Sequence, residues 1–338
     1  MLALSILSLA ALAVASPMRS AQDYATSLRN VARQSVSESD VDNFAFYAEH
    51  ASAAYCNAGA STGATVSCGG NCPEVEANGA TILGSFDGLW TGIASYVALD
   101  TARTEIVLSV RGSSNVRNWL SNLDFNFEDS PIVSRGRVHD GFNRAWSEMR
   151  SGVTATIRDA IKAHPGYRVV ATGHSLGGAV ATLGAAQLRN DGIPVDIYTY
   201  GSPRVGNGVL SDYISNQAGP EFRITHLDDP VPRLPPIIFG YRHTSPEYWL
   251  SRGESTADDY PVSDIRVCPG NANIKCNAGT FGLDVDAHLT YFGPMTSDIC
   301  DGAFKTRAAA ASADEDDAEL ESRLNAWVEQ DIAFVEGQ

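Results

Sequence analysis

The fold of this chain is decided by the sequence TGHSLGGA at Thr172–Ala179, which contains the pattern Gly-x-Ser-x-Gly directly after a short apolar run. A strand that enters this pattern and leaves it as a helix forms the nucleophile elbow of serine hydrolases. The turn is so tight that its serine, here Ser175, adopts a strained backbone conformation. Gly173 and Gly177 have no Cβ, so the strand and the helix can approach each other closely. The pattern therefore predicts that Ser175 is a nucleophile.

The surrounding sequence supports this interpretation, which the short pattern alone would not justify. Residues 176–189 are small and helix-forming, and Asn-Asp-Gly at 190–192 ends them. Other segments predict helices at 41–55 and 140–163, a hairpin of strands at 91–99 and 105–111, and strands at 195–200 and 222–225. Alternating strands and helices indicate an α/β fold with a mostly parallel central sheet covered by helices on both faces.

The first 34 residues are predicted to be processed. Residues 2–15 are almost purely apolar and end in Ala-Val-Ala-Ser at 13–16, which predicts a secretory signal peptide at 1–16 although basic residues are missing there. A run of about 14 residues is too short to span a bilayer, and no later stretch is long enough, so we expect secretion and no integral membrane segment. Residues 17–34 predict a propeptide cut near Arg33, with an ordered N-terminal helix as the alternative.

The rest of the chain divides into a domain at 35–304 and an acidic tail at 305–338. Residues 311–338 hold nine acidic residues and one arginine, which is half of the net charge of −16. Apolar residues recur there at helical spacing and predict an amphipathic helix, either docked on the domain or removed in maturation; they are Leu320, Leu324, Trp327, Val328 and Val335. The negative charge argues against nucleic acids and anionic surfaces as partners and favours a neutral substrate.

Six cysteines in a secreted chain predict three disulfides, for which fifteen sets of pairs exist. The pairs Cys68–Cys72 and Cys268–Cys276 are close enough in sequence to close local loops. The pair Cys56–Cys300 would then join the two ends of the domain. Zinc binding is the alternative, but the spacings differ from those of zinc sites. We therefore expect neither a metal ion nor a cofactor.

A nucleophilic serine needs a base within hydrogen-bond reach and an acid that orients this base. In α/β-hydrolases the order along the chain is serine, acid, histidine. His288 comes late enough to lie in a loop beyond the last strand, whereas His226 is inside a predicted strand and His243 in a polar loop. The loop after the strand that contains His226 offers Asp228 and Asp229 as the acid, and the residues alone do not choose between them.

Two donors must stabilise the oxyanion that forms in acyl transfer. We expect one to be the N–H of Leu176 and the other to be Ser113, at the end of the second hairpin strand. Val116, Trp119 and Leu120 follow at helical spacing, which predicts a short lid. Its apolar face would cover the site in water and turn outward at a lipid surface. A helix simply packed on the core is the alternative.

The sequence between about residues 40 and 302 resembles the filamentous-fungal class 3 lipases of the Rhizomucor and Thermomyces type, and most of all their Fusarium and Gibberella branch. The resemblance rests on eight runs, which are AAYC at Ala53–Cys56, SVRGS at Ser109–Ser113, NWL at Asn118–Leu120, HDGF at His139–Phe142, GHSLGGA at Gly173–Ala179, YGSPRVGN at Tyr200–Asn207, DPVPRLPP at Asp229–Pro236 and SPEYW at Ser245–Trp249.

This resemblance implies an α/β-hydrolase fold with a helical lid and the catalytic residues Ser175, Asp229 and His288. It selects Asp229 over Asp228 because the family's acid stands two positions before the Val-Pro-Arg run. Further implied features are the oxyanion donors Ser113 and Leu176, Trp119 on the lid, Tyr55 lining the pocket, and the disulfides Cys56–Cys300 and Cys68–Cys72. The chain lacks a further disulfide that part of the family has before the HDGF run.

The expected protein is a secreted, monomeric serine lipase that hydrolyses ester bonds of triacylglycerols at lipid–water interfaces through an acyl-enzyme, and a phospholipase side activity stays open. A feruloyl esterase is the alternative within enzymes, but a polar lid is expected there. A non-catalytic lipid-binding protein is the alternative from another class. Such proteins usually lose a catalytic side chain, whereas this chain keeps all three candidates. The choice therefore depends on the residues of the site and not on the fold.

Overall fold

The computed structural model describes residues 35–122, 124–300 and 314–338, the side chains of 314–316 excepted. The predicted signal peptide at 1–16 and propeptide at 17–34 lie outside these ranges, as do residues 301–304 at the end of the predicted domain. Within the ranges, no helix has the combination of length and apolar character that crossing a bilayer requires.

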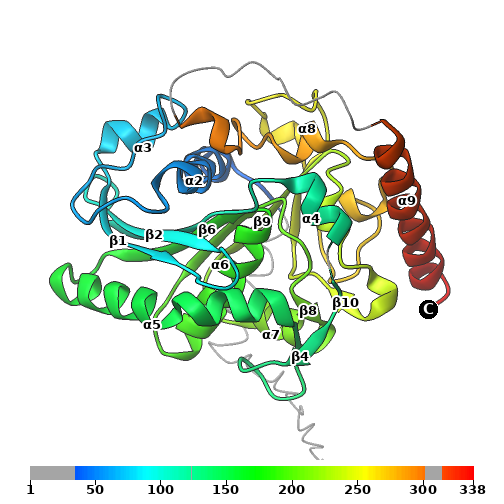
Figure 1. Ribbon diagram of the computed structural model, residues 1–338, viewed down its shortest axis with the longest axis horizontal. Coiled ribbons are helices and arrows are strands. Elements are labelled where there is room, and N and C mark those ends of the chain that lie inside the picture. The colour runs from blue at the N-terminus through cyan, green and yellow to red at the C-terminus, as the bar shows by residue number, and fades with distance from the viewer. Residues whose placement is uncertain (1–34, 123, 301–313) are drawn as a thin grey trace, which may run out of the picture.

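A sheet of eight strands runs through the molecule in the order β1-β2-β3-β6-β7-β9-β11-β12 (Figure 1). The strands β3, β6, β7, β9 and β11 are parallel, whereas β1 and β2 on one side and β12 on the other are antiparallel. The bounds are β1 (Thr81–Asp87), β2 (Ala94–Asp100), β3 (Glu105–Val110), β6 (Arg168–His174), β7 (Asp196–Tyr200), β9 (Glu221–His226), β11 (Glu247–Leu250) and β12 (Ile265–Cys268).

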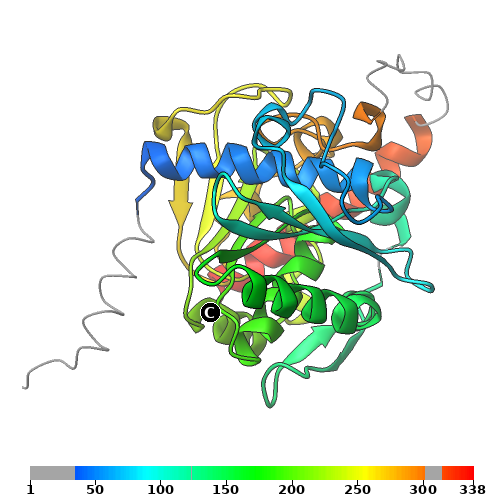
Figure 2. The same ribbon diagram turned by 90° about the vertical axis from the view of Figure 1, so that its left-hand side faces the viewer.

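Helices cover both faces of the sheet, as the sequence predicted (Figures 1 and 2). One face carries α2 (Glu38–Asn57) and α3 (Pro73–Asn78), and the other carries α5 (Asp140–Ala163), α6 (Leu176–Asn190) and α7 (Gly208–Asn216). The helix predicted at 140–163 is confirmed as α5, with the same first and last residues. The helix predicted at 41–55 begins earlier as α2, because Ser37 and Asp40 form a capping box at its N-terminus.

Several short elements and the long C-terminal helix α9 complete the described structure. Most of the short elements were not predicted because they are too brief to show a periodic pattern. A second sheet has the order β10-β8-β5-β4. Its strands are β10 (Tyr241–Arg242), β8 (Gly206–Asn207), β5 (Arg137–His139) and β4 (Phe127–Asp129). The other elements are α4 (Val116–Asn122), α8 (Val285–His288), α9 (Asp314–Glu336) and the 3₁₀ turns η1 (Val231–Arg233), η2 (Ile237–Phe239), η3 (Val262–Asp264), η4 (Asn277–Gly279) and η5 (Ser297–Ile299).

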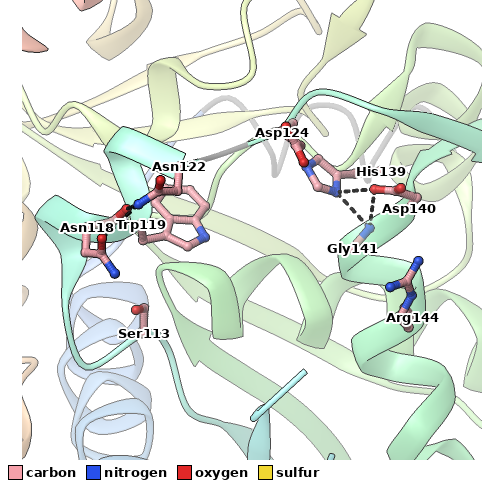
Figure 3. A pocket seen from close by; sticks show the side chains of 9 residues that line it. All are labelled: Ser113, Asn118, Trp119, Asn122, Asp124, His139, Asp140, Gly141 and Arg144. Carbon is pink, nitrogen blue, oxygen red and sulfur yellow. Dashed lines mark hydrogen bonds and ion pairs between the residues drawn. The ribbon is translucent and has the colours of Figure 1, made fainter. Parts of the chain in front are cut away.

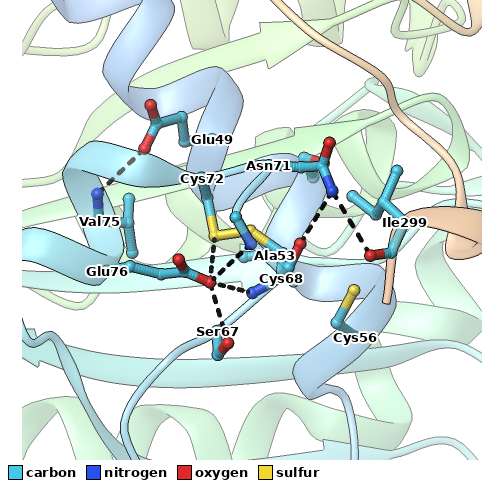
Figure 4. Close-up of a disulfide and its surroundings, with 12 residues drawn as sticks. Glu49, Ala53, Cys56, Ser67, Cys68, Asn71, Cys72, Val75, Glu76 and Ile299 are labelled. Atoms are coloured by element: carbon cyan, nitrogen blue, oxygen red, sulfur yellow. Dashed lines mark hydrogen bonds between the residues drawn. A yellow bond between two sulfur atoms is a disulfide. The ribbon is translucent and has the colours of Figure 1, made fainter. Parts of the chain in front are cut away.

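Three disulfides tie the described parts of the chain together, and they are Cys56–Cys300, Cys68–Cys72 and Cys268–Cys276. The first links the end of α2 to the residue after η5. The second closes the loop before α3, where the carboxylate of Glu76 accepts hydrogen bonds from the Cys68 N–H at 2.8 Å and the Ser67 hydroxyl at 2.9 Å (Figure 4). The loop is thus fixed by a disulfide and by hydrogen bonds to the carboxylate of Glu76.

The turn between β6 and α6 has the strained geometry that its sequence predicted. Ser175 has φ 57° and ψ −131°, a conformation that few residues other than glycine adopt. A Cβ on Gly177 would lie 2.1 Å from the Val110 carbonyl oxygen, and one on Gly173 would lie 2.5 Å from the Gly177 oxygen. Both glycines are therefore required by backbone atoms of β3 and α6 that cannot move aside.

We predict that Gly177→Ala destabilises the domain by about 3 kcal/mol or more, because the new methyl group overlaps rigid backbone. Gly59→Ala is the matched control, since a Cβ at Gly59 would meet no atom within 4 Å. Urea unfolding of the two variants and the wild type measures the difference. Equal stabilities would show that the elbow tolerates a side chain at this position.

Candidate active site

Ser175 lies at the carboxyl end of β6, on the edge of the sheet where the parallel strands end. Its side chain is fully buried, and its backbone N–H donates to the Tyr200 carbonyl at 2.9 Å. A Cβ on Gly112, just after β3, would lie 3.1 Å from the Ser175 Cβ, so β3 and β6 bring these segments together. The Ser175 hydroxyl has no hydrogen-bond partner in this structure.

His288, the last residue of α8, and Asp229, in the loop between β9 and η1, meet at the same edge of the sheet. His288 Nδ1 lies 2.9 Å from both carboxylate oxygens of Asp229, and both side chains are fully buried. The carboxylate accepts the Nδ1 proton, which leaves the lone pair of a neutral imidazole on Nε2. Nε2 is buried and has no partner. The pair therefore presents a free base.

Asp229 is the acid that contacts His288. The other candidates, Asp228 for the acid and His226 and His243 for the base, make different contacts. Asp228 is half-buried and points toward Gly282, where a Cβ would lie 3.3 Å from its Oδ2. His226 Nδ1 bonds to the Ala287 carbonyl at 2.9 Å, and its Nε2 pairs with the Tyr260 hydroxyl at 2.9 Å. His243 Nε2 donates to the Pro232 carbonyl at 2.6 Å. Both imidazoles are thus held by backbone carbonyl oxygens, and neither forms a hydrogen bond with Asp229.

Two further groups hold the Asp229 carboxylate in place, and a third holds the backbone of Asp229. The Val231 N–H donates to Oδ1 at 2.8 Å, and the Tyr291 hydroxyl donates to Oδ2. Burial and the charge of Asp229 raise the pKa of Tyr291 well above its usual value, so its hydroxyl keeps the proton that it donates. The Asn277 side-chain amide binds the Asp229 carbonyl oxygen at 3.0 Å. The carboxylate is thus fully hydrogen-bonded without solvent.

Sequence analysis missed a role for His174, the residue before the serine in the elbow motif. Its Nε2 lies 2.8 Å from the His288 carbonyl oxygen and must donate to it. Its Nδ1 therefore accepts the proton of the Tyr55 hydroxyl, which lies 2.8 Å away. Burial, and next the proximity of His288, lower the pKa of His174 well below its usual value, which keeps it neutral. Tyr55 and His174 thus fix the backbone position of His288.

The two expected oxyanion donors follow the ends of two neighbouring parallel strands, β3 and β6. Val110, the last residue of β3, pairs with Gly173 of β6, so the segments after both strands reach the same edge. Leu176 is the first residue of α6, where an N–H has no partner inside the helix. The Ser113 hydroxyl interacts with the backbone of Asn115 at 3.3 Å, at the start of α4. This places Ser113 between the sheet and the predicted lid.

The predicted lid is the helix α4, and a cavity of about 430 Å³ opens beside it. Ser113 and Trp119 lie at one end of this cavity, and His139, Asp140 and Arg144 lie at the other (Figure 3). Trp119 is half-buried, whereas Val116 and Leu120 on the same helix are buried. The cavity is therefore lined both by the predicted lid and by Ser113, one of the two expected oxyanion donors.

The apolar face of α4 is covered by the C-terminal helix α9. The sequence predicted this helix but not that it docks on α4. Leu320 and Leu324 of α9 pack with Val116 and Leu120 of α4 and with Val231 and Leu234, which follow the acid. Figure 1 shows α9, in red, along the side of the domain. Ser175 and His288 are fully buried in this arrangement.

A buried polar contact fixes the far half of α9. Asp331 accepts hydrogen bonds from the N–H groups of Ile237 and Ile238 at 2.8 and 2.9 Å and forms an ion pair with Arg204 at 3.5 Å. Both charged side chains are almost completely buried, and burial lowers the pKa of Arg204 to about 10. Arg117 of α4 also forms an ion pair with Asp317. The tail is therefore docked through specific contacts.

Cys68, Cys72 and Glu76 are a group of possible metal ligands within the described ranges. Their atoms lie close enough together, but the two sulfurs share a disulfide and are not available as thiolates. The group therefore does not have the chemistry of a zinc site. Our expectation that the protein needs no metal ion remains a prediction.

The strained serine at a strand–helix turn, the doubly covered parallel sheet and the adjacent histidine–aspartate pair are typical of the α/β-hydrolase fold. The comparison with known proteins agrees. The families Lipase (class 3) and Lipase 3 N-terminal region match residues 107–239 and 4–84. Together with the relatives described next, these matches show that the chain belongs to the class 3 lipases and is a secreted ester hydrolase.

Individual relatives support this assignment over nearly the whole chain. The chain is 51% identical to the secreted mono- and diacylglycerol lipase 1 of Fusarium solani, over 99% of this chain and 98% of that protein. It is 41% identical to the secreted mono- and diacylglycerol lipase A of Penicillium cyclopium, over 76% and 86%. The solved mono- and diacylglycerol lipase of Aspergillus oryzae is 36% identical, with a TM-score of 0.72, over 78% and 99%.

We predict that the domain loses stability below pH 6.5. Burial lowers the pKa of five histidines, so these side chains are neutral when the protein is folded. They are His50, whose pKa is lowered to about 4, and His139, His174, His226 and His243. The unfolded chain binds their protons near pH 6.5, so stability is complete above that pH and falls as the pH decreases toward 4. Each strongly shifted histidine contributes about 1 kcal/mol per pH unit. Urea unfolding at pH 7, 5.5 and 4.5 measures this, and equal values would contradict it.

We predict that Leu324→Asp releases α9 and raises the hydrolysis of a dissolved short-chain ester. Losing this buried leucine removes about 2 kcal/mol or more of packing free energy, which also holds α4 in place. Gln330→Asp, on the exposed face of the same helix, is the control. The rate is measured with p-nitrophenyl butyrate below its solubility limit, and limited proteolysis reports the release of α9. A released helix with an unchanged rate would show that α9 does not restrain α4.

Proposed function

We propose that Ser175, His288 and Asp229 are the catalytic residues of this lipase and that they act through an acyl-enzyme. The observation that carries this proposal is the buried, unpaired Nε2 of His288, whose imidazole Asp229 orients and whose backbone His174, next to Ser175, binds. No hydrogen bond joins the Ser175 hydroxyl to Nε2 in this substrate-free structure. Catalytic hydrogen bonds are often long in such structures and shorten when substrate binds.

In this mechanism Ser175 Oγ attacks the ester carbonyl carbon while His288 Nε2 takes the hydroxyl proton. The carbonyl oxygen becomes an oxyanion that the Leu176 N–H and Ser113 stabilise, and losing one such donor costs about 2.7–4 kcal/mol. The bond to the alcohol breaks, and His288 returns the proton to the departing oxygen. Water then attacks the acyl-enzyme in the same way and regenerates the serine. Asp229 stabilises the imidazolium in both halves of the reaction.

Acylglycerols are the substrates that we propose, and the names of the Fusarium and Penicillium relatives favour monoacyl- and diacylglycerols among them. The buried apolar residues Val116 and Leu120 on α4 support a lid that opens at a lipid–water interface. This apolar face favours a lipase over a feruloyl esterase, for which a polar lid is expected. The presence of all three proposed catalytic residues, Ser175, His288 and Asp229, favours an enzyme over a non-catalytic lipid carrier.

We also propose that the mature protein is a monomer without residues 1–34, in which 35–304 form the catalytic domain. The capping box at the start of α2 supports a folded domain that begins near residue 35. The residues 305–338 form a separate C-terminal segment whose helix rests on the lid. The apolar and polar contacts of α9 support its retention in the folded chain.

We predict that Ser175→Ala lowers ester hydrolysis by at least about 10,000-fold, because the nucleophile is lost. Ser147→Ala, at an exposed position of α5, is the control. A panel of mono-, di- and triacylglycerol emulsions, phosphatidylcholine and methyl ferulate identifies the preferred substrate. A fluorophosphonate probe should label the wild type and not Ser175→Ala. A folded wild type that neither reacts with the probe nor hydrolyses any ester would instead be a lipid-binding protein.

A further inference from the structure

The turn that joins β1 to β2, residues 88–93, exposes two large apolar side chains next to each other. Leu89 is 92% and Trp90 is 88% exposed. Among the large apolar residues that the structure describes, the next most exposed is Phe239 at 47%. Exposing an adjacent leucine and tryptophan to water is unfavourable, and such patches mark sites of interaction.

The 88–93 turn is held rigidly, so its two apolar side chains are presented in a fixed position. The Gly88 N–H donates to the Ile93 carbonyl at 2.8 Å, and the Gly92 N–H donates to the Gly88 carbonyl at 3.1 Å. The Thr91 hydroxyl donates to Glu148 of α5 at 2.8 Å. A Cβ on Gly88 would lie 2.1 Å from that carboxylate, so the backbone of the turn packs directly on α5.

The 88–93 turn lies at the edge of the sheet that carries the active site. Ser95, at the start of β2, pairs with Val110, at the end of β3, and Val110 pairs with Gly173 of the elbow strand. The Arg111 side chain donates to the Gly92 carbonyl at 3.0 Å, which links the turn to the segment leading to Ser113. Figure 2 shows the β1–β2 turn and α4 on the same side of the molecule.

We propose that the 88–93 turn is a fixed lipid anchor, in which Leu89 and Trp90 insert into the surface of an acylglycerol aggregate and hold the active-site edge against it. This inference rests on the proposed lipase function and adds to the lid a second, independent contact with lipid. Tryptophan is favoured at lipid–water boundaries because its ring is apolar and its N–H is polar. The net charge of −16 selects a neutral surface over an anionic one.

Because α4 must move before it exposes its apolar face, while Leu89 and Trp90 are already exposed, the anchor binds lipid first. Binding through the 88–93 turn would then place α4 at the surface where it opens. The contribution of the turn is therefore expected in the binding step and not in the chemistry. A dissolved ester, which needs no surface binding, should not report it.

The test compares the double variant Leu89→Ser/Trp90→Ser with Val209→Ser/Tyr213→Ser, which removes two partly exposed apolar side chains from α7. Partitioning onto a trioctanoylglycerol emulsion is measured by sedimentation, with Ser175→Ala added to both so that no substrate is consumed. We expect the turn variant to bind at least about tenfold more weakly than the control, because two large apolar groups no longer insert. With Ser175 restored, both variants should hydrolyse dissolved p-nitrophenyl butyrate like the wild type.

Quenching by brominated lipid provides a direct measurement of insertion. The wild type should lose more tryptophan emission on brominated acylglycerol than Trp90→Phe does, by the share that Trp90 contributes.

Equal partitioning of both double variants, together with equal quenching, would overturn the anchor while leaving the lipase function intact. An oligomer that dissociates only in the turn variant, seen by sedimentation velocity without lipid, would also overturn it and identify the turn as a self-association surface. Loss of all ester hydrolysis by the wild type would instead contradict the proposed function.

Discussion

The close approach of β6 and α6 at Ser175 is the constraint on which the rest of this structure depends. Only glycine fits at Gly173 and Gly177, where backbone atoms lie within 2.5 Å of any added Cβ. The resulting turn forces Ser175 into a positive φ, and it directs the hydroxyl and the first N–H of α6 to the same place. Every other part of the site is positioned relative to this turn.

A chain of buried hydrogen bonds connects the elbow to the base and the acid. Tyr55 donates to His174, His174 donates to the His288 backbone, and the imidazole of His288 donates to Asp229. Each group is satisfied on the side away from Ser175, so the lone pair of Nε2 and the serine hydroxyl are left as the unpaired atoms. An unpaired polar atom is costly in a dry interior, and this cost keeps the site reactive toward a substrate that can pair with it.

The helices α4 and α9 share one apolar cluster, and we propose that they control access to the buried site. The lid is held from outside by α9, and α9 is held at its far end by the buried Asp331. Apolar packing of this kind is weakened at a lipid surface, where exposed leucine and valine side chains find another apolar environment. In the function that we propose, opening of the site is therefore linked to contact with lipid on the edge that also carries the 88–93 turn.

The sequence by itself determined the elements with a long periodic pattern and the chemistry with a short fixed one. The 140–163 helix and the elbow could be read from local residues, because each depends on neighbours in the chain. The candidate histidine came from the order serine, acid, histidine that α/β-hydrolases share. The choice of Asp229 over Asp228 came from a family resemblance, since both follow the same strand. The role of His174, the short second sheet and the docking of α9 on α4 were decided only by the tertiary structure. They depend on contacts between residues far apart in sequence, which no local pattern encodes.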